Sequence, residues 1–114
     1  MLLRLVKRAR ECGREDDALR WALESLRVAA AIWDRRRLVQ VLDLLAAIAA
    51  GRGELARAGL LRGAVEAEAD RAPLSAWAMT ELPAAALQDA TFERGRQDGL
   101  QLTLEAAVEA ALPP

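Results

Sequence analysis

The chain has no histidine, and this absence removes the imidazole on which most general acid–base catalysis depends. It also has no tyrosine and only one phenylalanine, so that aromatic residues make up 4% of its 114 residues. Strands are enriched in aromatic and β-branched residues, whereas most of the apolar residues here are Ala and Leu, which favour helices. The composition therefore predicts an all-α protein.

Cysteine occurs once, at Cys12, so the chain cannot form an internal disulfide and cannot supply the Cys and His ligands of a structural zinc site. Because Cys12 has no histidine partner, we interpret it as a structural or incidental thiol. A single cysteine favours a reducing compartment, and we expect a cytoplasmic protein. The net charge of −1 gives no strong attraction to nucleic acid or to an anionic membrane. The longest apolar run, 38–50, includes Asp43 and is too short to span a bilayer.

Apolar residues at helical spacing predict a series of helices separated by glycines, prolines and capping residues. The predicted helices are 2–12, ended by Gly13; one from Asp16 or Asp17 to about Trp33; 35–50, capped by Asp34; 54–69; Pro83 to about Asp98, closed by Gly99; and a short one after Thr103. Residues 73–83 are expected to form either a loop with a helical turn or a short helix. The segment 35–50 is apolar over most of its girth, which predicts a central position in the fold.

Two glycines indicate an internal repeat. Gly13 and Gly53 lie 40 residues apart, and each is followed five residues later by an alanine, Ala18 and Ala58. Paired helices with a period near 40 residues are typical of an α-solenoid. Small residues at helix crossings let two backbones approach to about 8 Å. We therefore expect four residues to serve helix packing: Ala18, Ala46, Ala58 and Gly63.

Two phrases resemble the tetratricopeptide-like region of large bacterial transcriptional regulators, namely the multidomain LuxR-type, MalT-like and antibiotic-regulator-like ATPases. The first phrase is "RAGLLRGAVEAEADRAPLS", matched at Arg57, Ala58, Leu61, Gly63, Ala64, Glu66, Ala67, Pro73 and Leu74. The second is "TFERGRQDGLQLTLEAAVEAAL", matched at Phe92, Gly99, Leu102, Thr103, Leu104, Glu105, Ala107 and Val108. The resemblance covers about 16–112, with a shortened span between the two phrases and without the regulators' nucleotide-binding and DNA-binding domains.

The resemblance implies a tetratricopeptide-like α-solenoid of about two helix pairs over 1–72, the first one incomplete. Residues 73–114 would then form an irregular segment and the capping helices of the same domain. It also implies a scaffold or sensor module that is a part or a relative of a bacterial transcriptional regulator. A free-standing adaptor is the alternative, and whether the chain is a fragment or complete stays open.

In such an array the first helix of each pair lines a concave groove. Six residues form the predicted partner-binding groove: Arg4, Lys7, Arg10, Gln40, Asp43 and Trp77. A basic stripe in a groove is suited to an acidic peptide or a chain-end carboxylate. The competing interpretation is a solvated face, or a face covered by another helix.

Two other clusters have weaker functional interpretations. Glu66, Glu68 and Asp70 alternate along the chain, and Glu66 and Asp70 share a helix face that could serve a carboxylate site, but a solvated helix end is the favoured interpretation. The basic run 35–37 could contact phosphate, as a small nucleic-acid-binding protein would require, or could pair with acidic residues of the preceding helix. The sequence thus predicts a non-enzymatic interaction or sensor module without cofactor, with a protein or peptide partner, a second copy of the chain included, and without direct nucleic-acid binding.

Overall fold

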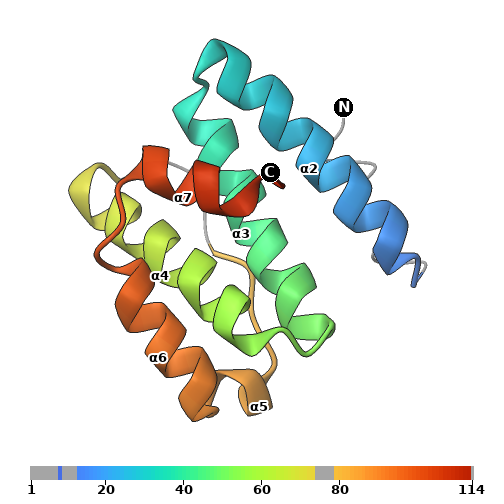
Figure 1. Cartoon of the computed structure of the whole chain (residues 1–114), viewed down its shortest axis with the longest axis vertical. Coiled ribbons are helices and arrows are strands. Elements are labelled where there is room, and N and C mark those ends of the chain that lie inside the picture. The colour runs from blue at the N-terminus through green and yellow to red at the C-terminus, as the bar shows by residue number, and fades with distance from the viewer. Residues whose placement is uncertain (1–7, 9–12, 74–78, 114) are drawn as a thin grey trace.

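The computed structural model describes residue 8 and the ranges 13–73 and 79–113. Arg4, Lys7, Arg10, Cys12 and Trp77, which carried sequence predictions, lie outside these ranges. The elements of the described chain are all helices, which confirms the all-α class (Figure 1). They are α2 (Glu15–Ile32), α3 (Arg35–Gly51), α4 (Leu55–Arg71), α5 (Ala84–Leu87), α6 (Ala90–Gly99) and α7 (Leu104–Ala111).

The helices α2, α3, α4 and α6 lie side by side in chain order, and the short α5 packs against α6 (Figure 1). The C-terminal α7 then folds back and contacts α2, α3 and α4 together. The principal extents are 34 × 32 × 31 Å, so the return of α7 gives a nearly isotropic body. Of the helices that the described ranges form, none is long and apolar enough to cross a membrane.

Turns with a left-handed backbone residue recur every 20 residues in the first half of the described chain. Gly13, Trp33 and Gly53 all have a left-handed backbone, with φ of 75°, 50° and 79°. The residue after each has a similar conformation, with φ between −78° and −93° and ψ between 71° and 92°. The last two turns also close with the same hydrogen bonds, Asp34 N to Ala29 O and Glu54 N to Ala49 O. These are the 6→1 hydrogen bonds of the Schellman motif, a common way in which helices end.

The two glycines from which the repeat was predicted therefore share a backbone conformation, and a third position between them shares it too. Trp33 occupies the position of the glycines midway between them. A residue other than glycine rarely adopts this conformation, because it costs about 1–2 kcal/mol, so a tryptophan at position 33 does not indicate a third equivalent turn.

Two predicted helix caps are confirmed. The Asp34 carboxylate accepts a hydrogen bond from Arg37 N at 3.2 Å, and Thr103 Oγ1 accepts one from Ala106 N at 3.1 Å. The start of α2 differs from the prediction, because the helix already begins at Glu15 and its cap position, Arg14, makes no side-chain capping bond.

The single helix predicted from Pro83 to Asp98 is wrong. The chain forms two helices there, α5 and α6, separated by Gln88 and Asp89. The Asp89 carboxylate accepts a hydrogen bond from Thr91 N at 2.8 Å, so this side chain caps a new helix instead of continuing the first. Aspartate competes for backbone N–H groups in this way, and its preference for caps outweighed the helical spacing of the alanines.

The core is centred on α3, as its wide apolar stripe predicted. Every residue from Val41 to Ala49 is buried, together with Leu38 and Val39. Residues of α2, α4 and α7 surround this helix, including Leu26, Leu61 and Val108. The proposed packing residues Ala18, Ala46 and Ala58 are all fully buried, and Gly63 is buried as well.

The closest helix contact joins α4 and α6 through four glycines. Gly59 and Gly63 on α4, and Gly95 and Gly99 on α6, are each spaced four residues apart. A Cβ at any of them would overlap a backbone carbonyl of the facing helix. Pairs of small residues with this spacing let helices approach without intervening side chains, as they do in membrane helices. Gly99 was expected to end its helix; it is the last residue of α6, and the structure gives it a packing role as well.

Candidate binding hollow

Of the predicted groove residues, Gln40 and Asp43 belong to the part of the chain that the structure describes. Four of the six lie outside the described residues, and Gln40 is half-buried on α3. Asp43 is 2% exposed, so the expectation that it faces an open groove is wrong. Its carboxylate accepts a hydrogen bond from Thr80 N at 2.7 Å and pairs with Arg62 at 3.6 Å. Asp43 therefore fastens the segment before α5 to the core.

Glu66 does not belong to an open carboxylate site. Both of its oxygens accept hydrogen bonds from Arg96 of α6, at 2.9 and 3.0 Å. The hydrogen bonds that Arg96 donates to Glu66, together with those that it donates to Glu93, raise the pKa of Arg96 above its ordinary value, against the opposing effect of burial. Asp70 is exposed, and the described chain contains no group of three potential metal-binding side chains. Glu66 thus works as a bidentate link across the α4–α6 contact.

The basic run 35–37 is also partly used by the fold. Arg35 Nε donates to Glu68 Oε2 at 2.6 Å, and Arg35 Nη2 donates to the backbone oxygens of Glu68 and Ala72. The acidic partner lies on α4, whereas the sequence interpretation placed it on the preceding helix. Arg71 donates to the other Glu68 oxygen at 2.9 Å.

Glu68 is a buried carboxylate that sequence reasoning placed on a solvated helix end. Burial by itself raises the pKa of this group, but the hydrogen bonds from Arg71 and Arg35, together with their positive charges, outweigh it. The net result is a pKa below the ordinary value of 4.5. Glu68 is therefore charged at neutral pH, and it holds the end of α4 to the start of α3.

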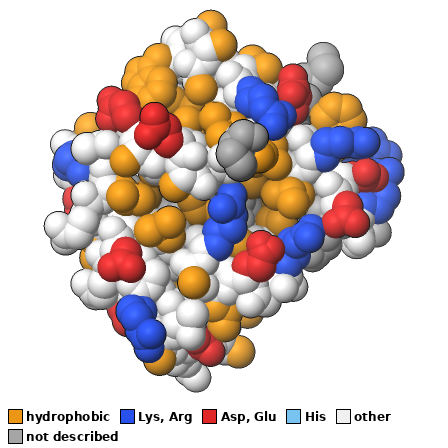
Figure 2. All heavy atoms as spheres, viewed as in Figure 1, with side chains coloured by type: hydrophobic (Ala, Val, Ile, Leu, Met, Phe, Trp, Pro, Cys, Tyr) orange, Lys and Arg blue, Asp and Glu red, His pale blue; other side chains and the backbone are white. Residues whose placement is uncertain are grey.

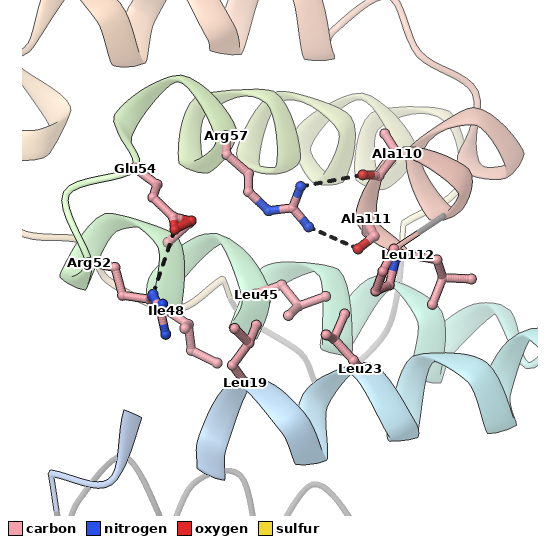
Figure 3. Close-up of a pocket in the computed structure, with 12 residues that line it drawn as sticks. Leu19, Leu23, Leu45, Ile48, Arg52, Glu54, Arg57, Ala110, Ala111 and Leu112 are labelled. Atoms are coloured by element: carbon pink, nitrogen blue, oxygen red, sulfur yellow. Dashed lines mark hydrogen bonds and ion pairs between the residues drawn. The ribbon is translucent and has the colours of Figure 1, made fainter. Parts of the chain in front are cut away.

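A hollow of about 360 Å³ opens where α2, α3, α4 and α7 meet (Figure 3). We call it the α2–α7 hollow. Its floor consists of four aliphatic side chains from two helices, Leu19 and Leu23 of α2 and Leu45 and Ile48 of α3. Figure 2 shows hydrophobic side chains gathered in the middle of this face, around the C-terminal end of the chain, with charged side chains about them.

Charged residues of the α3–α4 turn and of α4 form the rim of the α2–α7 hollow. Arg52 pairs with Asp16 at 2.9 Å and with Glu54 at 3.6 Å. Arg57 instead donates to the backbone oxygens of Ala110 and Ala111, at 3.4 and 2.8 Å, and its side chain crosses from α4 to the end of α7 (Figure 3). Among the described residues, no carboxylate pairs with Arg57.

Sequence reasoning did not identify the α2–α7 hollow. Part of its floor could have been suspected from Leu19 and Leu23, two leucines at helical spacing. No local sequence pattern indicated that Arg57 contacts α7, because the two are more than 50 residues apart in the chain. No family model, curated protein or solved structure matches this chain.

Proposed function

We propose that the protein is a non-enzymatic protein–protein interaction module that binds a partner segment in the α2–α7 hollow. The observation that carries the proposal is a hollow between closely packed helices, in whose aliphatic floor Leu19 and Leu23 are partly exposed while Leu45 and Ile48 belong to the buried core. Partly exposed apolar hollows with a few polar groups at the rim are the usual form of binding sites.

The helix order supports the view that this is a tetratricopeptide-like α-solenoid of about two helix pairs with a C-terminal cap. The turns at Gly13, Trp33 and Gly53 recur at 20-residue intervals, so that each helix pair spans 40 residues. Such arrays act as scaffolds for peptide and protein partners. On the strength of the two matching phrases, we further propose that the chain is a part or a relative of a bacterial transcriptional regulator in the cytoplasm, with a free-standing adaptor as the alternative.

The two other function classes receive less support from the contacts. A carboxylate enzyme would need Glu66 accessible to substrate, but both its oxygens hold Arg96. A nucleic-acid binder using the run 35–37 would need Arg35, which is engaged by Glu68. Glu66 and Arg35 would each have to break strong charge-assisted hydrogen bonds before they could contact a substrate or a phosphate.

The proposal is tested with a peptide array, on which random peptides are presented both with free and with blocked C-termini. The variant Ala110→Trp places a large ring at the mouth of the α2–α7 hollow from an exposed position, so that folding should be unaffected. The matched control is Ala85→Trp, an exposed alanine of α5 away from the hollow. We expect some peptides to bind both the wild type and Ala85→Trp, and the signal of these peptides to fall at least 10-fold with Ala110→Trp. If no bound peptide is sensitive to Ala110→Trp, the hollow is not the binding site.

A further inference from the structure

The rim of the α2–α7 hollow carries a guanidinium whose charge has no carboxylate partner in the described chain. Arg57 differs in this respect from Arg35, Arg52, Arg62 and Arg96, each of which pairs with an acidic side chain. Its acceptors are two neutral carbonyls in the last turn of α7. The partial negative charge at a helix C-terminus favours this position but balances only part of a unit charge.

Arg57 also retains unused hydrogen-bond donors. A guanidinium has five N–H groups, and the two bonds to Ala110 and Ala111 use two of them. These bonds hold the side chain across the hollow, so that less conformational entropy is lost when a ligand binds. A carboxylate is the acceptor that fits this planar donor set best, because both of its oxygens can be bound at once.

The lining of the hollow indicates where that carboxylate comes from. Arg57 and the leucines of the floor line the same hollow of about 360 Å³, which is within the range of ligand pockets, roughly 300–1,000 Å³. A chain-terminal residue is the smallest unit of a polypeptide that offers an aliphatic side chain and a carboxylate together. The aliphatic group for the floor and the carboxylate for Arg57 can therefore come from the same residue.

We propose that the α2–α7 hollow binds the C-terminal residue of a partner polypeptide, with an aliphatic side chain on the leucine floor and the α-carboxylate on Arg57. This inference rests on the proposed function, and it names the chemistry of the partner. Capture of a chain-end carboxylate is an established form of peptide recognition. An internal aspartate or glutamate does not meet both requirements, because its carboxylate takes the place of the aliphatic group.

The test compares short labelled peptides that end in Leu, Ile, Val, Ala, Asp or Lys, each made as the free acid and as the C-terminal amide. Fluorescence polarisation measures their affinity for the wild-type protein. We expect peptides with an aliphatic last residue to bind at least about 10-fold more tightly as the acid than as the amide, as one charge-assisted hydrogen-bond pair implies. Equal affinity of the acid and amide forms, or no binding of any aliphatic free acid, overturns the inference.

Two variants assign the preference to Arg57. In Arg57→Gln the difference between acid and amide should disappear while binding of the amide is unchanged, and Arg57→Lys should restore part of it. Arg94→Gln, at an exposed position of α6, is the matched control and should keep the full preference. A preference that persists in folded Arg57→Gln overturns the role of Arg57. If Arg57→Gln does not fold, the acid–amide comparison on the wild type still decides the inference.

The outcomes separate this inference from the proposed function. Peptides that bind through the hollow, as judged by loss with Ala110→Trp, but show no acid preference overturn the inference and keep the function. Absence of any binding sensitive to Ala110→Trp overturns both.

Discussion

Gly63 on α4 lies so close to Arg96 on α6 that a Cβ at position 63 would overlap the Arg96 carbonyl oxygen. The same relation holds in the reverse direction at Gly99, which faces the carbonyl of Leu60. The two helices therefore meet backbone to backbone, and Arg96 uses its side chain at the same place to bind Glu66. Substitutions at this contact are therefore expected to change the stability of the protein.

Gly63→Ala should destabilise the protein by about 1–3 kcal/mol, because the added methyl group has a backbone atom in its way. Alanine is otherwise the better helix former by about 1 kcal/mol, so a loss of stability in Gly63→Ala would by itself indicate the close helix contact. The matched control is Ala56→Gly, an exposed position of the same helix, where loss of the methyl group should cost about 0.5–1 kcal/mol. Urea denaturation measures both variants. A more stable Gly63→Ala would contradict the observed separation of α4 and α6.

Ala58→Leu should also destabilise the protein by about 1–3 kcal/mol through overpacking. Ala58 is fully buried in a small cluster with Leu82 and Phe92, next to the same helix contact. Ala56→Leu, two residues away on the exposed side of α4, should change stability by less than about 0.5 kcal/mol. Thermal unfolding followed by circular dichroism compares the two, and equal melting temperatures would mean that the register of α4 is wrong.

Gly53→Ala should cost about 1 kcal/mol for a purely conformational reason. The φ of Gly53 is 79°, and a Cβ there meets no atom within 4 Å, so steric contact adds nothing. Gly53→Asn should cost less, since asparagine tolerates the left-handed region better than alanine. Urea denaturation of the two variants tests the order. If alanine and asparagine cost the same, conformational preference does not determine the stability of this turn.

Stability should fall at acidic pH partly because of Glu68. Its pKa in the folded protein is lower than the ordinary value of 4.5, so the folded state binds the proton less readily than the unfolded chain. The resulting stabilisation is complete above the unfolded pKa and is lost as the pH falls below about 4.5 and through the folded pKa.

The variant Glu68→Gln isolates this effect. It should lose about 1–3 kcal/mol at pH 7, as expected for charge-assisted hydrogen bonds, and the difference from wild type should shrink toward pH 3. Urea denaturation across this range provides the measurement. Glu24→Gln serves as the control, because its pair with Arg27 is about half exposed and should contribute little at any pH. A constant difference between Glu68→Gln and wild type would show that the charge of Glu68 does not stabilise the fold.

The sequence by itself determined the helices and most of their ends. Apolar spacing, two glycines, Asp34 and Thr103 are local signals, and each acts through hydrogen bonds or dihedral preferences within a few residues. The central position of α3 also followed from its composition, because a helix that is apolar on all sides must be covered on all sides.

Only the tertiary structure decided how distant segments meet. The pairing of Gly59 and Gly63 with Gly95 and Gly99 depends on which helices become neighbours, and local spacing does not specify that. The same holds for Asp43 and Glu68, which looked solvent-facing in the sequence and became buried because arginines from other segments reached them. The α2–α7 hollow exists because α7 folds back over α2, α3 and α4, a long-range contact set by packing of the whole chain rather than by any motif within it.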